Sequence, residues 1–299
     1  MSGRRRPGRS GAWGRPRADS PQPRSGHRAR KRFGQHFLER AWIDKVVRAV
    51  APTTDDVFIE VGPGHGALTF PLLTAARHVI AIEIDRDLAA DLRATSPPNL
   101  TVLEADALSV SPDQLRATLE AAGLLGARLR LVGNLPYNVA SPILFHWVAW
   151  TEAGLPFVDA TVMLQREVAD RIVAAPATAE YGVLAVLLRQ VAAPTRLLAL
   201  PPGAFRPAPE VHSAVLRLAW HGPDPVPRRL DVCRALVRAV FTRRRKTLSN
   251  ALQAYPLPDR LPPAVVLATA CIDGQRRPET LDIAEFVRLA DAVSTEEIA

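Results

Sequence analysis

The sequence predicts an α/β fold: a Rossmann-like sheet with helices on both faces, followed by a small helical domain. Short apolar, β-branched runs alternate with amphipathic stretches from Phe33 to about residue 221, and this alternation is typical of a mostly parallel sheet. From about residue 222 onward only helical patterns appear. With 299 residues and 47% hydrophobic content, the chain can bury a large core and a smaller one. We therefore expect three parts: a tail over 1–32, the sheet domain over 33–221 and the helical domain over 222–299.

The expected strands and helices follow one another in order. Strands are predicted at 57–61, 78–84, 100–105, 128–133 and 157–164, where apolar β-branched residues dominate. Amphipathic helices are predicted between them at about 67–76, 86–95, 112–122 and 141–150. The runs "TRLLAL" and "HSAVLRLAW" close the domain, and "DVCRALVRAVF" and "DIAEFVRLADAV" are the clearest helices beyond it.

The net charge of +8 belongs mainly to the first 32 residues. They hold 11 Lys or Arg and a single acid, Asp19, whereas the other 267 residues hold 27 bases and 29 acids. Rich in Arg, Gly, Pro and Ser, this segment cannot bury enough apolar surface to fold alone, so we expect a disordered tail. Dispersed arginines could bind a phosphate backbone, or the tail could simply be solvated.

Several classes of protein are not expected. No run has the length of a membrane span or the apolar core of a signal peptide. The two cysteines, Cys233 and Cys271, lie in no metal-ligand spacing and offer no disulfide framework, so we expect no metal and a reducing, cytoplasmic location.

A glycine-rich turn follows the first predicted strand, where Gly62, Gly64 and Gly66 are spaced G-x-G-x-G. Such a turn lets a ligand approach the backbone closely, although a purely structural turn has the same appearance. A dinucleotide site would carry glycine at the position of Ala67, so the spacing disfavours NAD.

Acidic residues mark the ends of the next two strands. Glu83 ends the second strand, where a carboxylate can accept hydrogen bonds from both hydroxyls of a ribose. Asp106 closes the third and could bind the amino group of an adenine. Because the carboxyl ends of parallel strands meet at one edge, the glycine turn and these two acids together predict a nucleoside site.

The fourth strand ends in Asn134-Leu135-Pro136-Tyr137. Turn chemistry accounts for Gly133, and for Ser141 and Pro142 as a helix start. It does not account for an aromatic residue at Tyr137, where a turn favours small polar residues. A further function of this segment is therefore indicated.

Taken together, these motifs resemble one family. The segments "KRFGQHFL", "EVGPGHGALT", "IEIDRDLA", "EADAL", "VGNLPYNVASPILFH", "MLQREVADRIVA", "AFRPAPEVHSAVLRL" and "FTRRRKTLSNAL" are similar, in the same order, to those of the bacterial small-subunit rRNA adenine dimethyltransferases, the kasugamycin-sensitivity family of class I S-adenosylmethionine-dependent methyltransferases. The resemblance covers nearly everything after the tail. It implies a monomeric enzyme that dimethylates two adenosines near the 3′ end of small-subunit rRNA, on an assembling 30S subunit, without a membrane partner.

The resemblance also assigns the cofactor site. It implies that S-adenosylmethionine is held by His36, Leu38, Gly62, Gly64, Glu83, Asp106 and Asn134. Many relatives have Asn at the position of His36, which leaves open whether the side chain or the backbone makes that contact.

The catalytic assignment concerns the four residues Asn134 to Tyr137. If the side-chain oxygen of Asn134 and the carbonyl of Leu135 accept hydrogen bonds from an adenine amino group, they favour a pyramidal nitrogen whose lone pair points at the methyl group. Pro136 stiffens the turn, and Tyr137 offers a face on which an extruded adenine stacks. In-line positioning then supplies much of the rate, with no strong base and no metal.

Two further groups are assigned to the substrate. Phe205, in a Pro-rich loop, is expected to cover the other face of the target base, although a core role that anchors the loop is the alternative. The run Arg243, Arg244, Arg245 and Lys246 is expected to open a helix of the second domain and to contact rRNA phosphates.

Other activities remain open at this point. One is adenine methylation of large-subunit rRNA or DNA, although Leu135 in place of the first Pro of an Asn-Pro-Pro-Tyr signature favours rRNA. The other is a ribosome-assembly binding factor in which catalysis is secondary.

Overall fold

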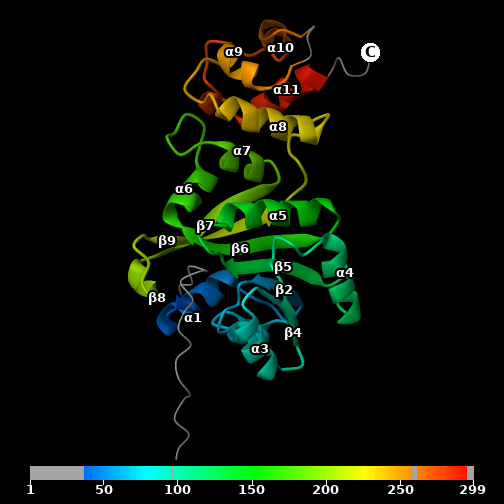
Figure 1. Cartoon of the computed structure of the whole chain (residues 1–299), viewed down its shortest axis with the longest axis vertical. Coiled ribbons are helices and arrows are strands. Elements are labelled where there is room, and N and C mark those ends of the chain that lie inside the picture. Colours follow the sequence, from blue (N-terminus) through cyan, green and yellow to red (C-terminus); the bar gives the residue numbers. More distant parts are fainter. Residues whose placement is uncertain (1–36, 96, 258–260, 295–299) are drawn as a thin grey trace, which may run out of the picture.

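The structure, a computed structural model, describes residues 37–95, 97–257 and 261–294 (Figure 1). Seven strands form one sheet in the order β4-β3-β2-β5-β6-β9-β7. They are β2 (Asp56–Val61), β3 (His78–Glu83), β4 (Leu100–Glu104), β5 (Arg128–Asn134), β6 (Phe157–Gln165), β7 (Ala192–Leu200) and β9 (Ser213–Trp220). All five strands predicted from apolar runs are present, so the Rossmann-like α/β prediction is confirmed.

One strand departs from the parallel pattern. The pairs β3–β4, β2–β3, β2–β5 and β5–β6 are parallel, but β9 pairs antiparallel with both β6 and β7. β7 therefore runs with the other strands, and β9 alone is reversed. A hairpin-like return between β7 and β9 explains the reversal, because their connection, which the structure describes throughout, contains no helix long enough to cross the sheet, only the turn Pro202–Ala204, β8 (Phe205–Arg206) and a loop over 207–212. β8 pairs instead with β1 (Phe37–Leu38) in a two-stranded ribbon.

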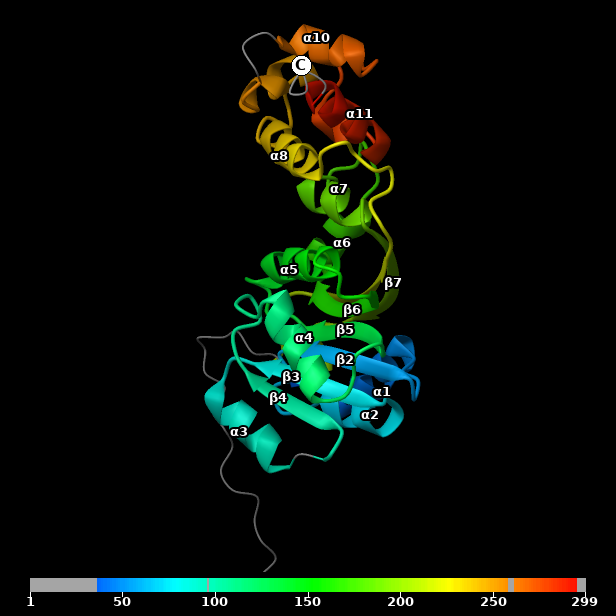
Figure 2. The ribbon, with the colours of Figure 1, turned by 90° about the vertical axis from the view of Figure 1, so that its right-hand side faces the viewer.

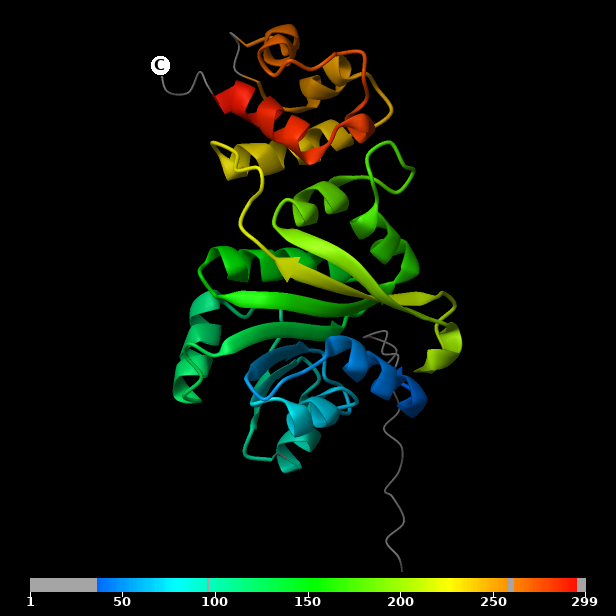
Figure 3. The ribbon, with the colours of Figure 1, turned by 180° about the vertical axis from the view of Figure 1, so that it is seen from behind.

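Helices cover both faces of the sheet (Figures 2 and 3). On one face α1 (Arg40–Val50) and α2 (Thr69–Ala75) pack on alternate strand residues such as Phe58. On the other, Ile59 packs in the core formed with α4 (Pro112–Ala121), α5 (Ala140–Glu152) and α6 (Arg166–Val173). Residues of even number in β2 thus face α1 and α2, and this places Glu60 on the same side as Phe58. The remaining helix of this domain is α3 (Arg86–Ala94), between β3 and β4.

The helical domain lies at one end of the molecule (Figure 1). It contains α8 (Leu230–Phe241), α9 (Leu248–Ala251), α10 (Pro263–Thr269) and α11 (Ile283–Ser294), with short turns at Leu252–Ala254 and Pro278–Thr280. Its core also includes residues that precede the predicted boundary at 222: Tyr181 and the helix α7 (Val183–Arg189) pack within it. The Tyr181 hydroxyl donates to the carbonyl of Leu281 at 2.9 Å. The packing unit therefore begins near residue 174, before the change in sequence pattern.

Two expectations concern the ends of the chain and the membrane. The predicted tail, residues 1–32, lies outside the described residues. Within the described part of the chain, no helix combines the length and the apolar character needed to cross a bilayer.

Candidate active site

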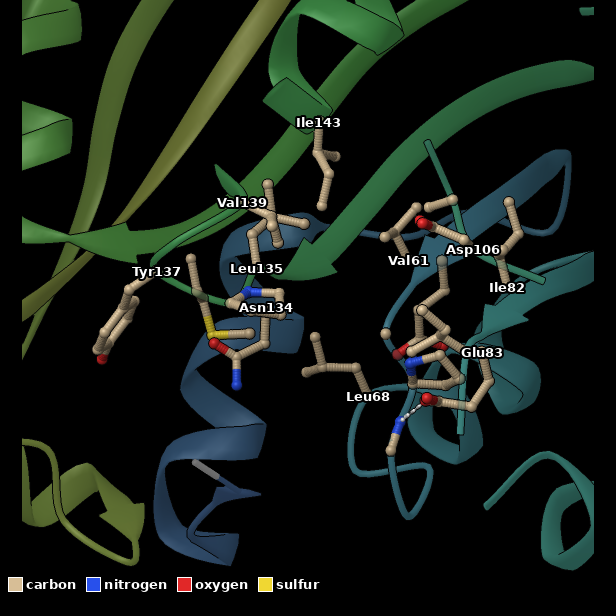
Figure 4. Close-up of a pocket in the computed structure, with 18 of the residues that line it drawn as sticks. Val61, Leu68, Ile82, Glu83, Asp106, Asn134, Leu135, Tyr137, Val139 and Ile143 are labelled. Atoms are coloured by element: carbon tan, nitrogen blue, oxygen red, sulfur yellow. Dashed lines mark hydrogen bonds between the residues drawn. The ribbon is translucent and has the colours of Figure 1, made fainter. Parts of the chain in front are cut away.

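A cavity of about 320 Å³ opens at the carboxyl edge of the sheet, where β2, β3, β4 and β5 end (Figure 4). Most of the residues singled out in the sequence meet there: Leu38, Gly62, Gly64, Glu83, Asp106, Asn134, Leu135, Pro136 and Tyr137 all line it. His36 lies outside the described residues. Residues up to 99 positions apart in the chain, from Leu38 to Tyr137, thus meet at one cavity.

The glycine turn has a backbone that other residues rarely adopt. Gly62, Gly64 and Gly66 have φ angles of +70°, +57° and +80°. A Cβ on Gly66 would lie 2.4 Å from the Phe70 ring, and one on Gly64 would lie 3.1 Å from the Phe37 ring. Glycine is therefore favoured by the backbone conformation at all three positions, and at Gly64 and Gly66 also because neighbouring rings occupy the space of a side chain.

Glu83 is held at the end of β3 by two backbone amides. Its Oε2 accepts from the N–H of Gly64 at 3.0 Å, drawn in Figure 4, and its Oε1 accepts from the N–H of Asp85 at 2.9 Å. Only 3% of the residue is exposed. Burial raises the pKa of Glu83, although both amides oppose the shift. Glu83 also lines the cavity, and a carboxylate can accept further hydrogen bonds from ligand hydroxyls.

Asp106 lies beyond the end of its strand rather than closing it. β4 ends at Glu104, and Asp106 is exposed in the following turn, where its Oδ1 accepts from the N–H of Leu108 at 2.9 Å. Two exposed apolar residues flank these acids in the cavity lining: Ile84, 49% exposed, and Leu108, 36% exposed. Sequence reasoning passed over both, although each closely follows an acid at a strand end.

A further acid, Glu60, lines the cavity from β2 and was not singled out in the sequence. It is 2% exposed, and its Oε2 accepts from the Thr69 hydroxyl at 2.6 Å. Burial, reinforced by the nearby charge of Glu83, raises the pKa of Glu60 to about 7, although the Thr69 hydrogen bond opposes the shift. The signal in the sequence was an acid within an otherwise apolar strand, "VFIEV".

The segment after β5 is fixed from both sides. A Cβ on Gly133 would lie 2.8 Å from the carbonyl oxygen of Val61, so glycine lets β5 approach the end of β2. Leu135 is 1% exposed, and its N–H donates to the carbonyl of Met163 at 3.2 Å. Asn134 is thereby held at the strand end with its amide in the cavity lining (Figure 4).

Tyr137 lines the cavity at the end away from Glu83 (Figure 4). Its hydroxyl shares a 2.9 Å hydrogen bond with the hydroxyl of Ser213, which is 2% exposed on β9. Burial raises the pKa of Tyr137, while the bond to Ser213 lowers it. The phenol is therefore anchored at its polar end. Ser213, like Glu60, was not singled out in the sequence.

Phe205 is not placed as expected. It is 2% exposed, it pairs with Leu38 across the β1–β8 ribbon, and it packs in the core beneath α1. It is absent from the residues that line the cavity. The alternative assignment, a core residue that anchors its loop, describes this structure, because the ring fills the space between the ribbon and the sheet.

The basic run at 243–246 does not open a helix. α8 ends at Phe241, and Arg243 to Lys246 form the turn before α9. Arg244 is used within the protein: its Nε donates to Glu279 at 2.6 Å and an Nη donates to the carbonyl of Thr178 at 3.0 Å. Arg243 donates to the carbonyl of Asn250 at 2.9 Å but is exposed, as are Arg245 and Lys246. Only part of the run is therefore available to a phosphate backbone.

This strand order, with one reversed strand and a glycine turn followed by an acid at the next strand end, defines a class I methyltransferase. The fold is similar to a dimethyladenosine transferase from Plasmodium falciparum, with a TM-score of 0.69 and 24% identity over 85% of this chain and 96% of that one. It is also similar to the 23S rRNA methyltransferase ErmE, with a TM-score of 0.60 and 26% identity over 87% of this chain and 100% of that one.

Sequence comparison identifies the family. The sequence profile of ribosomal RNA adenine dimethylases matches residues 26–289, and the chain belongs to this family. Proteins named ribosomal RNA small subunit methyltransferase A from a Burkholderia species and from Acinetobacter baylyi are each 46% identical to it. The first alignment covers 90% of this chain and 93% of the relative, and the second covers 89% and 93%.

Proposed function

We propose that the chain transfers methyl groups from S-adenosylmethionine to the N6 amino groups of two adjacent adenosines near the 3′ end of small-subunit rRNA. The observation that carries this proposal is one cavity that joins Glu83 to Asn134 and Tyr137, in a chain 46% identical to small-subunit methyltransferases over 90% of its length. The cavity suits a nucleoside at one end and a second, stacked base at the other.

The chemistry of the lining fits the cofactor. The Glu83 carboxylate suits the two ribose hydroxyls, and Asp106 suits the adenine amino group. Ile84 and Leu108 offer apolar surface to the faces of that adenine. Gly62 and Gly64 line the cavity next to Leu38, and the methionine portion lies along this part of the lining.

The bound cofactor supplies an electrophilic methyl group on a sulfonium. The protein orients the nucleophile. At the end of β5, the side-chain oxygen of Asn134 and the carbonyl of Leu135 accept hydrogen bonds from the adenine amino group. This draws the nitrogen lone pair out of conjugation with the ring and toward the methyl carbon. Since Gly133 and Leu135 are fixed against β2 and β6, the two acceptors are preorganised.

Tyr137 captures the extruded adenine. Because its hydroxyl is bound to Ser213, the ring has little freedom to rotate away, and its face presents a stacking surface. Each of the two methyl transfers releases one proton from the amino nitrogen to solvent, and no base is required in the transfer itself.

The RNA partner also requires basic surface outside the cavity. Arg245 and Lys246 are exposed in the turn between α8 and α9 and contact phosphates of the rRNA, with Arg243 and Arg244 supporting the turn. The substrate is a small-subunit assembly intermediate, and the chain acts on it as a monomer in the cytoplasm.

The test is single-turnover methyl transfer from labelled cofactor to small subunits that lack the modification, with large subunits as the control. Asn134→Ala should lower the transfer rate far more than it lowers affinity for the particle, because its bonds form as the nitrogen pyramidalises. Tyr137→Ala should weaken capture of the base as well, by roughly 1–3 kcal/mol. Tight binding with no transfer by the wild type would favour a binding factor, and methylation of large subunits instead would favour the other substrate.

A further inference from the structure

Glu60 lies where a ligand that joins the two ends of the cavity must pass. The sheet order places β2 between β3, which carries Glu83, and β5, which carries Asn134. In the proposed function, the ribose lies at Glu83 and the reacting amino group at Asn134. The sulfonium lies between these two groups in the cofactor and so crosses the end of β2, where Glu60 lines the cavity.

We propose that Glu60 is the group by which the cavity distinguishes the cationic cofactor from its uncharged thioether product: it releases a proton when the sulfonium binds and regains one from solvent after the methyl group has left. This inference rests on the proposed function of the chain. It adds a role in product release that hydrogen bonds to the ribose and adenine cannot supply, because both forms of the cofactor share those groups.

The surroundings of Glu60 leave its charge uncompensated. From α2 it receives one hydrogen bond, from the neutral Thr69 hydroxyl to Oε2, and in the sheet it pairs with Ala81 on β3 and Val132 on β5. The ionisable group that acts on it is another acid, Glu83. Among the described residues no lysine, arginine or histidine forms an ion pair with Glu60.

Because no cation in the described part of the chain compensates its charge, Glu60 titrates near neutral pH. Burial and the charge of Glu83 raise the pKa of Glu60 to about 7, so the free protein holds it partly protonated near neutral pH. An opposite charge within a few ångströms lowers the pKa of an acid by about 1–3 units. By linkage, the ionised form then binds the cation more tightly by the same factor.

A comparison of S-adenosylmethionine with S-adenosylhomocysteine separates the effect of charge from the effect of ligand shape. S-adenosylmethionine carries one more positive charge than S-adenosylhomocysteine and is otherwise alike apart from the methyl group. The preference for the sulfonium form should therefore rise about tenfold between pH 6 and pH 8.5, as Glu60 ionises. Binding of the sulfonium form near pH 7 should release protons, and binding of the thioether should release few or none.

Calorimetry on the full chain measures both quantities. Titrations of each ligand in phosphate and in Tris, whose ionisation enthalpies differ, give the number of protons released. Glu60→Gln keeps the size of the side chain and should abolish both the proton release and the rise in preference. Thr69→Val removes the hydrogen bond that favours the charged form, so it should move the midpoint to higher pH, whereas Thr69→Ser should leave it in place.

Three results would overturn the proposal: equal proton release with both ligands, a wild-type preference that does not change with pH, or a pH-dependent preference that persists in Glu60→Gln. If Glu60→Gln does not fold, the two Thr69 variants still test the proposal. If the pH midpoint of the ligand preference in Thr69→Val equals that of the wild type, the titrating group is not Glu60. Failure of the proposed function has a different signature, since neither ligand would then bind or the loaded protein would not methylate small subunits.

Discussion

Both edges of the sheet bury carboxylate side chains, but within the residues that the structure describes the amino edge pairs them with arginine and the carboxyl edge does not. At the amino edge, Arg130 lies between Asp56 and Asp159, with contacts of 2.9 Å from Nη1 to Asp56 and 2.7 Å from Nε to Asp159. Its Nη groups also donate to the carbonyls of Val50 and Ala51 at the end of α1. At the carboxyl edge, Glu60 and Glu83 are buried as deeply, but their partners are hydroxyl and amide groups.

The pKa values express this difference. Although burial raises the pKa of Asp56, hydrogen bonds from Thr53 and Arg130 lower it more, and the net shift is downward. The pKa values of Glu60 and Glu83 are shifted upward, with burial as the largest cause. A buried network that compensates its own charges supports the structure, whereas one that leaves negative charge uncompensated suits a cationic ligand.

Breaking the amino edge should give the largest effect on folding. Arg130→Met removes the cation and leaves two buried carboxylates without it, so we expect the free energy of unfolding to fall by roughly 3–5 kcal/mol. Urea denaturation measures it. Arg128→Met is the matched control, because Arg128 also pairs with Asp56 but its side chain is 43% exposed, and it should cost about 1 kcal/mol or less. Similar losses in both variants would show that the buried network is not the main support of this edge.

The carboxyl edge should instead lose stability when its acid ionises. The pKa of Glu60 is about 7 in the folded chain and 4.5 in the unfolded chain. Between these two pH values the folded state therefore binds more protons than the unfolded state. The contribution of Glu60 to the free energy of unfolding is therefore fully present below pH 4.5. It is lost as the pH rises to about 7, for a total loss of about 3 kcal/mol. Glu60→Gln should flatten the unfolding free energy over this window. A wild-type profile that rises from pH 4.5 to 7 just as steeply as that of Glu60→Gln would contradict the assignment.

Ligand affinity gives the next comparison between the edges. Glu83→Ala should weaken S-adenosylmethionine binding by at least roughly 1.5–3 kcal/mol, the contribution of one hydrogen bond to a charged acceptor. Asp106→Ala should weaken it as well, and by less than Glu83→Ala, because Asp106 is exposed to water. Calorimetry measures the affinity of both variants for S-adenosylmethionine, with the amino-edge variant Arg128→Met as the control. Unchanged affinity in both acid variants would remove the cofactor assignment.

The sequence predicted the carboxyl edge better than the contacts away from it. Strand ends can be read from period and composition, and parallel strands bring their carboxyl ends together, so the sequence could anticipate that Gly62, Glu83 and Asn134 meet at one cavity. It could not anticipate the contacts of Phe205 and Arg244, because these depend on packing between distant segments. Phe205 meets Leu38 across the β1–β8 ribbon, and Arg244 meets Glu279.

Glu60 shows a different limit of sequence reasoning. An acid in an apolar strand is visible in the sequence, but its significance depends on what lies opposite. Only the fold shows that Thr69 and Glu83 lie beside it, while Arg128 and Arg130 lie at the other edge of the sheet. Local pattern thus locates the site, and tertiary contacts determine its charge.

The smallest expected effect concerns the neutral hydrogen bond that fixes Tyr137 at the carboxyl edge. Ser213→Ala removes the hydroxyl partner of the phenol, and Tyr137→Phe removes the same bond from the other side. Each should cost about 1 kcal/mol in stability, the net worth of one such bond. If the bond also orients the ring for stacking, both variants should bind unmodified small subunits more weakly than the wild type by a similar factor, with cofactor affinity unchanged. Double substitution should add nothing further, because either change already breaks the bond. Additive losses in the double variant would show that Ser213 and Tyr137 act separately, and that the ring is held by its packing alone.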